Sequence, residues 1–202
     1  MDPSYERPVH LGYLDPLELV WVQAAGRMGV RILRDPELFA GTDGEGNLSL
    51  GTADTLDPDD CVAQMIFHEI CHWIVNGRET YHLPDWGFPV DGPFDWREHA
   101  CLRIQGILAE RHGLRDFLAP TTIFREYWDA LADAGVGPFE PLPGWPSEER
   151  VVALAQEALA RSSEEPWGPA LTEALVATAG IRDLVQPWIP SQRPGPGSLW
   201  GT

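Results

Sequence analysis

Residues 57–77 have the sequence DPDDCVAQMIFHEICHWIVNG, and this stretch decides the fold of the chain. Asp57 is a typical helix N-cap, Pro58 suits the first helical position, and acids in a first turn favour the positive end of the helix dipole. Gly77 is the next glycine and a natural end for a helix. The stretch therefore predicts one long helix over residues 58–76, about 28 Å in length.

The middle of this helix carries His68-Glu69-Ile70-Cys71-His72, an HExxH sequence. Two histidines four positions apart project from the same helical face, so both imidazoles can reach one cation, and Glu69 can hydrogen-bond a water on that cation. The core side of the helix is supplied by Ile66, Ile70, Trp73 and Ile74. The pattern favours a site for one divalent metal ion, and the alternative is two histidines hydrogen-bonded within a core.

A metal site built on two histidines needs a third ligand. The downstream candidates are His82, Asp85, Asp91, Asp95, Glu98 and His99. Glu98 lies 26 residues after His72, in a second helix expected over residues 96–112 and ended by Gly113. We expect Glu98 to be the third ligand, because two packed helices would bring its carboxylate opposite the histidine pair.

Helical phase separates Glu98 from its neighbour His99. The residues that share a face with Glu98 are Leu102, Gln105 and Ala109, whereas those that share a face with His99 are Arg103, Gly106 and Glu110. Glu98 therefore points more nearly inward. Two alternatives stay open: His99 is the ligand, or Glu98 is only the N3 member of a capping box that begins at Asp95.

The rest of the chain predicts an α+β fold. We expect helices over 16–28, 123–134, 147–161 and 169–186, short strands over 30–33 and 47–50, and loops over 41–46, 78–95 and 135–146. The expected organisation is a metal-binding domain over residues 1–134, a helical C-terminal extension packed on it over 135–186, and a Pro/Gly-rich tail over 187–202. The expected fold class is a zincin-like single domain with short strands, the HExxH helix, a second ligand helix and helical C-terminal decoration.

Charge and composition exclude several classes of partner. The formal net charge of the 202 residues is -17, and no run of basic residues interrupts it, so neither nucleic acid nor an anionic membrane is expected to bind. No apolar stretch is long enough to span a bilayer, and the first residues lack the features of a secretory signal. A cytoplasmic protein is expected, with Cys61, Cys71 and Cys101 as reduced thiols.

After the HExxH sequence and Trp73, the chain continues with Gly77-Arg78, Asp85-Trp86-Gly87, Asp91-Gly92 and then Glu98. This order resembles the bacterial elongation factor P hydroxylase family, in which an HExxHW helix precedes a D-aromatic-G segment, a DG turn and a later glutamate. The expected strands before the helix are similar to short strands of that family. The resemblance covers residues 28–112, about 85 of the 202.

The resemblance implies a non-haem iron centre in which His68, His72 and Glu98 form a 2-His-1-carboxylate triad. The implied activity is an O2-dependent hydroxylation of a protein side chain, and the family's substrate is the modified lysine of elongation factor P. A protein or peptide substrate is therefore expected, with elongation factor P as the candidate. The candidates for the substrate pocket are Trp73, Asp85, Trp86 and Arg103.

The same ligand set resembles zinc peptidases of the gluzincin type, so the ion is either Fe(II) or Zn(II). The role of Glu69 differs between the two enzymes. In a peptidase Glu69 is the indispensable base that activates water, whereas in an oxygenase it would orient a ligand or a metal-bound water. A third hypothesis is a non-catalytic metal-binding module whose acidic surface docks a cationic partner.

Overall fold

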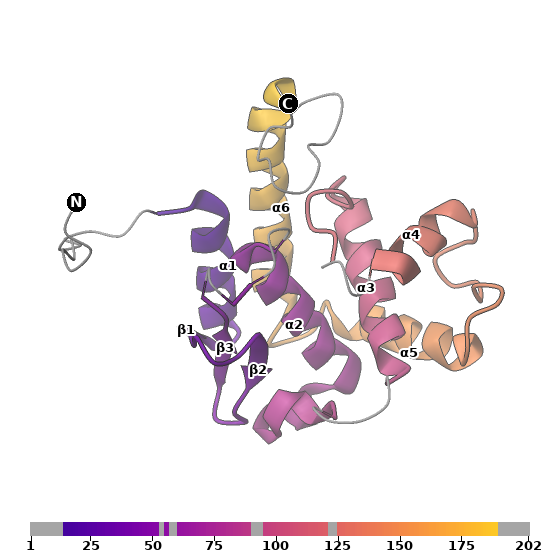
Figure 1. Ribbon diagram of the computed structural model, residues 1–202, viewed down its shortest axis with the longest axis horizontal. Helices are drawn as coiled ribbons and strands as arrows, with labels where there is room; N and C mark the ends of the chain where they lie inside the picture. The colour runs from indigo at the N-terminus through magenta and orange to yellow at the C-terminus, as the bar shows by residue number, and fades with distance from the viewer. Residues whose placement is uncertain (1–13, 53–54, 57–59, 90–94, 121–124, 190–202) are drawn as a thin grey trace, which may run out of the picture.

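The fold is given by a computed structural model that describes residues 14–52, 55–56, 60–89, 95–120 and 125–189 (Figure 1). Within these ranges the chain forms six α-helices and one three-stranded sheet, which is the α+β class expected. Helix α1 and the sheet lie at one side of the molecule, α2 runs through its middle, and α3, α4 and α5 lie at the other side. None of the described helices combines the length and apolar composition that a bilayer crossing requires.

The N-terminal part consists of α1 (Pro16–Arg27) and three strands, β1 (Arg31–Arg34), β2 (Ala40–Thr42) and β3 (Asn47–Leu50). The sheet order is β1-β3-β2, with β1 parallel and β2 antiparallel to β3. The side chain of Asp15 caps α1 by accepting the N–H groups of Leu17 and Glu18.

Strand β2 corrects the expectation of a loop over residues 41–46. Gly41 pairs with Ser49 and Thr42 with Leu48, so two of those residues belong to the sheet. The turn shrinks to residues 43–46 because the carboxylate of Asp43 accepts the N–H groups of Glu45 and Asn47. The glycines of this segment suggested a longer loop. Because the turn is short, residues 40–42 are free to form a third strand.

Helix α2 (Val62–Asn76) is shorter than the helix expected over residues 58–76. Cys61 is extended, at φ -133 and ψ 149, and its Sγ accepts the N–H of Gln64 at 3.4 Å. The cap is therefore Cys61, whereas the expected cap Asp57 and the adjoining Pro58 lie outside the described residues. The helix ends at Gly77 as expected, and this residue has φ 98, a left-handed value that suits glycine.

Two 3-10 segments, η1 (Arg78–His82) and η2 (Pro84–Gly87), occupy much of the region expected as loop over 78–95. Within η2, Asp85 and Trp86 both have left-handed backbone angles, with φ 48 and φ 47. Helix α3 (Arg97–Arg111) follows, one residue shorter at each end than expected, and the Asp95 carboxylate accepts the N–H of Arg97 at its start. The segment η2 contacts α2, where the side-chain amide of Asn76 donates to the carbonyl of Trp86 at 2.9 Å.

The C-terminal part comprises α4 (Arg125–Asp133), α5 (Glu148–Arg161), α6 (Gly168–Val185) and η4 (Gln186–Trp188). One apolar core joins α5 and α6 to α1, α2 and α3, and Trp73 of α2 meets Trp167 edge-on at 5.0 Å. Helix α4 packs in a second cluster, in which Tyr127 contacts Leu102 and Leu142. The largest fully buried members of the first core include Trp21, Phe67, Ile66, Ile70, Trp73 and Trp167. The helices after residue 135 thus help to bury the helix that carries the HExxH sequence.

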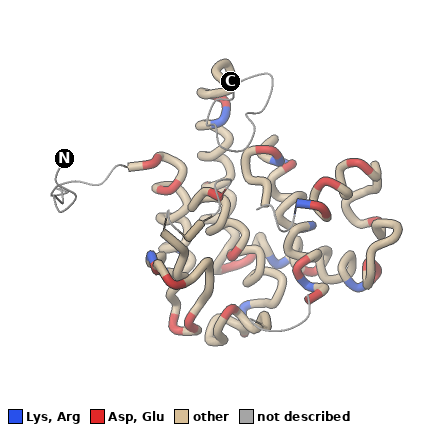
Figure 2. The backbone as a smooth tube through the Cα atoms, in the orientation of Figure 1, with Lys and Arg blue, Asp and Glu red and all other residues tan. Residues whose placement is uncertain are grey.

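Charged residues lie outside this core with few exceptions. Figure 2 shows Asp and Glu spread over most elements, with the basic residues at scattered positions among them. The main exception is Arg103, which pairs with Glu148 where both side chains are almost fully buried, at 1% and 5% exposure. The Glu148 carboxylate also accepts a hydrogen bond from the hydroxyl of Tyr127, so this buried charge pair connects α3 to α4 and α5.

Candidate metal centre

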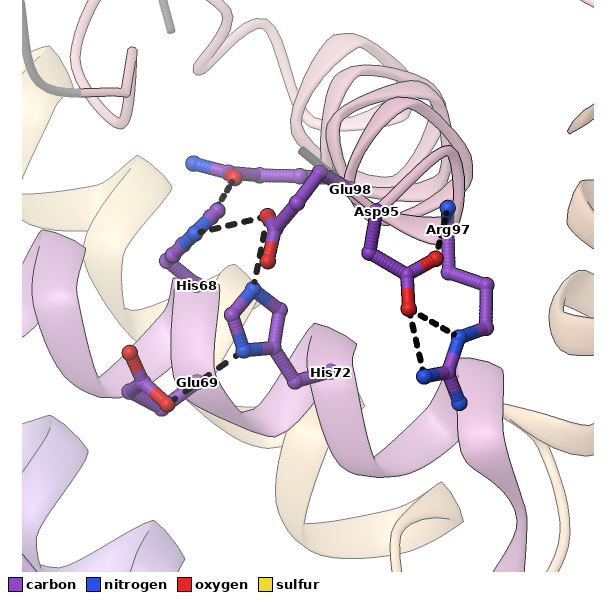
Figure 3. A network of polar contacts seen from close by, with 7 residues as sticks. His68, Glu69, His72, Asp95, Arg97 and Glu98 are labelled. Carbon is purple, nitrogen blue, oxygen red and sulfur yellow. Dashed lines mark hydrogen bonds and ion pairs between the residues drawn. The ribbon is translucent and has the colours of Figure 1, made fainter. Parts of the chain in front are cut away.

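Helix α3 packs against α2, and the contact brings Glu98 to His68 and His72. One ligand atom from each residue lies within 4.8 Å of the others, so the three form a group that could hold a metal ion (Figure 3). Oε2 of Glu98 is 3.1 Å from Nε2 of His72 and 3.9 Å from Nε2 of His68. The Glu98 carboxylate is thus engaged with α2, which speaks against its expected alternative role in a capping box.

His68 is held in one tautomer by Gln105 of α3. The amide nitrogen of Gln105 donates to the carbonyl of Leu118 at 2.9 Å, so the amide oxygen is the group that faces Nδ1 of His68 at 2.8 Å. An oxygen acceptor requires the proton on Nδ1. Burial, with the charge of His72 next, lowers the pKa of His68, so the ring is neutral and Nε2 presents a lone pair toward Glu98.

His72 lies between two carboxylates. Its Nε2 faces Glu98 at 3.1 Å and its Nδ1 faces Oε2 of Glu69 at 3.5 Å. Burial alone would lower the pKa of His72, but the charges of Glu98 and Glu69 outweigh burial and raise that pKa to about 10. In the absence of an ion, His72 is therefore the cation that Glu98 and Glu69 share.

Glu69 and Glu98 are ionised beside the two rings. Burial would raise the pKa of each carboxyl, but the neighbouring His72 lowers both pKa values below their ordinary range. The side chains are 12% and 14% exposed, so the cluster is neither sealed in the core nor open to bulk water. Two imidazoles and a carboxylate at this depth suit a divalent cation such as Fe(II) or Zn(II).

The other candidates for the third ligand lie elsewhere. His99 stacks on Tyr127 at 3.9 Å with an interplanar angle of 5°, in the cluster of the buried Arg103. His82 is exposed, and Asp95 accepts two hydrogen bonds from the guanidinium of Arg97. Asp91 lies outside the described residues. None of the described residues among these joins the group of His68, His72 and Glu98.

Asp85 lies near the cluster, but its carboxylate hydrogen-bonds to the sheet. Its Oδ1 accepts the N–H of Thr42 at 2.9 Å on the outer edge of β2. Burial raises the pKa of Asp85, and the charge of Glu69 raises it further. The charges of Glu69 and His72 both act on Asp85, so this candidate for a substrate pocket lies close to the metal centre.

The remaining pocket candidates are packed away from solvent. Trp73 and Trp86 are 1% and 2% exposed and stack on each other at 5.6 Å, so they belong to the core rather than to an open wall. Arg103 lines a cavity of about 420 Å³ formed with α4 and residues 136–139, and that cavity includes none of the three clustered residues. Helical periodicity places an aromatic residue on a face without revealing how completely neighbouring elements cover it.

Sequence reasoning missed Gln105, Phe88 and Arg97 as supports of the site. Gln105 shares the helical face of Glu98, and that phase was a signal that it lies near His68. Phe88 stacks on His72 at 4.4 Å and Arg97 covers Phe88 at 4.6 Å, contacts between separate segments that no local pattern encodes.

The geometry defines a class of site: two imidazoles from one helix and a carboxylate from the next, placed where a single metal ion could be held. Comparisons of the chain with models of protein families, with curated proteins and with solved structures find no match.

Proposed function

We propose that this chain is a non-haem iron enzyme that holds one Fe(II) ion with His68, His72 and Glu98 and hydroxylates a protein side chain. The observation that carries the proposal is the pair of acceptors that face each other across the centre. Gln105 keeps the proton of His68 on Nδ1, so Nε2 presents a lone pair to the carboxylate of Glu98 at 3.9 Å. A bound cation would take the place of the His72 proton among these groups, and two histidines with one carboxylate are the donor set of Fe(II) oxygenases.

The position of Glu69 supports an oxygenase rather than a hydrolase. Glu98 meets Nε2 of His72, whereas Glu69 meets Nδ1 of the same ring (Figure 3). The two nitrogens of an imidazole point in diverging directions, so Glu69 lies behind the ring, away from the side where an ion would sit. A carboxylate behind a histidine ligand fixes the orientation of the ring and makes it a stronger donor.

Bound Fe(II) would supply the site at which O2 is activated. In the net reaction, one oxygen atom enters a C–H bond of the substrate and the other leaves as water, with two electrons from an external reductant and two protons. The residues of the chain hold the ion through His68, His72 and Glu98. Gln105 and Glu69 keep the two rings in their binding orientations.

The metal part of the proposal is tested by elemental analysis of protein purified without added metal under low oxygen. We expect iron at about one ion per chain, and its loss in His68→Ala and His72→Ala. His82→Ala, which removes an exposed histidine, is the matched control and should retain the metal. If the wild-type protein bound no iron even after anaerobic loading with Fe(II), the proposal would fail.

The substrate part rests on the resemblance to the elongation factor P hydroxylase family. We propose elongation factor P that carries its modified lysine as the substrate. Iron-loaded protein with a reductant and O2 should consume O2 and add the mass of one oxygen atom to that factor. If bound iron produced no substrate-dependent O2 consumption, and neither Fe(II) nor Zn(II) gave turnover, a non-catalytic metal-binding module would replace the hydroxylase.

A second candidate function is a zinc peptidase of the gluzincin type. It is favoured by one specific feature, an HExxH helix packed against the following helix that supplies a glutamate, which is also the basis for proposing a zincin-like fold. In this enzyme Glu69 would have to turn from His72 toward a zinc-bound water. Zinc-dependent hydrolysis of an unfolded polypeptide would support it.

Glu69→Gln separates the two functions. A peptidase should lose all hydrolysis while zinc stays bound, because the amide cannot act as a base. A hydroxylase should keep measurable turnover, because an amide oxygen can still accept a hydrogen bond from Nδ1 of His72. Glu157→Gln, at an exposed glutamate of α5, controls for the loss of one surface charge.

A further inference from the structure

Arg97 connects three segments that surround the metal centre. Its Nη1 donates to Oδ1 of Asn76 at the end of α2 at 2.8 Å, and its Nη2 donates to the carbonyl of Gly87 at 3.1 Å. Its Nε and Nη2 donate to Oδ2 of Asp95 before α3, at 2.9 and 2.5 Å. The planar guanidinium is thus fixed by oxygens from α2, from η2 and from the start of α3 (Figure 3 shows its pairing with Asp95).

Phe88 links this guanidinium to a residue of the metal centre. Cζ of Arg97 lies 4.6 Å from the centre of the Phe88 ring, and the ring of His72 stacks on Phe88 at 4.4 Å with an interplanar angle of 25°. Phe88 is only 8% exposed, so little room is left for its ring to move. A continuous chain of contacts therefore runs from Arg97 through Phe88 to the imidazole of His72.

The contacts on His72 divide into two kinds. Glu69 and Glu98 meet the ring at its two nitrogens, and Phe88 meets its face. Contacts at the edge of a ring leave it able to tilt, whereas a stacked neighbour limits the tilt. A lone pair must point at the ion within narrow angular limits for strong coordination, so the face contact bears directly on metal affinity.

We propose that Arg97 is a positioning residue of the metal centre, which holds the imidazole of His72 at the angle required for metal binding by pressing Phe88 against it. The inference rests on the proposed function, because it concerns the same metal ion. It assigns to Arg97 a role that neither the HExxH sequence nor the group of three clustered residues includes.

The chemistry of arginine explains why this position needs it. A guanidinium is planar, so it can lie over an aromatic ring while its edge donates to several oxygens in one plane. Lysine retains the positive charge but offers neither the flat face nor the fork of donors. Arg97→Lys therefore tests geometry separately from charge, and Phe88→Leu removes the stacked ring without touching the hydrogen bonds of Arg97.

The experiment measures Co(II) binding to full-length protein, with Co(II) as a coloured probe of the centre. The variants are Arg97→Lys, Phe88→Leu and their combination, and Arg125→Lys is the matched control, since Arg125 pairs with Asp129 on the exposed side of α4. The readouts are affinity from competition with a chelator, the visible absorption of bound Co(II), and the thermal midpoint of the metal-free protein. The absorption reports ligand geometry, which a general loss of stability does not change.

Arg97→Lys and Phe88→Leu should each weaken Co(II) affinity roughly 10- to 100-fold and change the absorption spectrum, whereas Arg125→Lys should change neither. The double variant should bind Co(II) only slightly more weakly than either single variant, because both substitutions break the same chain of contacts to His72. The inference would be overturned if Arg97→Lys kept the wild-type affinity and spectrum, or if the effects in the double variant were fully additive. Neither result would contradict the proposed metal site itself. Should Arg97→Lys fail to fold, an unchanged spectrum in Phe88→Leu overturns the inference as well. Absence of Co(II) binding to the wild-type protein would overturn both the inference and the proposed function.

Discussion

Oε2 of Glu98 lies 3.1 Å from Nε2 of His72, although 26 residues separate them in the chain. The same oxygen is 3.9 Å from Nε2 of His68, so one carboxylate oxygen serves both rings of the HExxH helix. The packing of α3 on α2 produces this arrangement, and it changes a two-histidine pattern into a group with three donors.

Metal affinity should increase with pH. The pKa of His72 is raised to about 10, so below that pH an ion must displace a proton from Nε2. His68 is already neutral at pH 7, because its pKa is lowered, and the carboxylates of Glu69 and Glu98 are ionised. The affinity for Zn(II) should therefore rise about tenfold per pH unit between pH 7 and 9, with release of one proton. Competition titrations at several pH values measure this slope, and an affinity independent of pH would contradict the assignment.

The metal-free protein should lose stability in alkali. The folded pKa of His72, about 10, lies above its ordinary value of 6.5, so its contribution is complete below pH 6.5 and is lost as pH rises through 10. The lowered pKa values of Glu69 and Glu98 act in the opposite direction: their contribution is present above the ordinary value of 4.5 and is lost as pH falls further. The lowered pKa of His68 likewise makes stability fall as pH drops below 6.5, so urea unfolding should give the highest free energy of unfolding near pH 6.5. His72→Gln should flatten the alkaline decline, and an unchanged decline in that variant would assign it to other groups.

Gln105→Leu should destabilise the fold by about 1–3 kcal/mol and weaken metal binding roughly 10- to 100-fold. The substitution removes the acceptor of the His68 Nδ1 proton and the donor to the carbonyl of Leu118, both of which are buried. Chemical denaturation and metal titration measure the two effects. Gln156→Leu, at an exposed position of α5, is the control. If both variants had equal effects, the claim that Gln105 fixes the tautomer of His68 would be contradicted.

Arg161→Met should cost about 1 kcal/mol of stability, because Arg161 supplies a cation that α2 lacks in its own last turn. Its Nη1 donates to the carbonyls of Ile74 and Val75 at 2.5 and 2.9 Å, at the negative end of the HExxH helix. Arg125→Met removes an arginine from an exposed i,i+4 pair and should have a smaller effect. Denaturation curves compare them, and an Arg161 variant as stable as the control would show that this cap contributes nothing.

Arg103→Leu should cost about 3–5 kcal/mol, because it leaves the carboxylate of Glu148 buried without its cation. The pair lies outside the metal centre, so the Co(II) spectrum of any folded variant should be unchanged. Differential scanning calorimetry measures the loss of stability, and the Co(II) spectrum shows whether the metal centre has changed. A spectrum altered to the same degree as in Arg97→Lys would mean that the centre responds to any loss of packing around α3.

Local sequence signals account for most of the elements of the fold. Asp15 before Pro16, Gly77 after α2 and Gly113 after α3 mark helix ends through capping and left-handed backbone, which depend on neighbours within a few residues. The helical register likewise places His68, His72 and Glu98 on usable faces. Strand β2 was missed because its residues are recognised by pairing with β3, and the Cys61 cap because cysteine is not among the residues preferred at a helix N-cap.

The sequence by itself determined which side chains could serve as metal donors, because the spacing of His68 and His72 follows from the period of one helix. Only the tertiary structure decided what those side chains contact. The tautomer of His68, the contact of Glu98 with both rings and the stacking of Phe88 on His72 all join separate segments of the chain. The physical reason is that a helix specifies directions along its own axis, whereas distances between helices are set by the packing of a shared core.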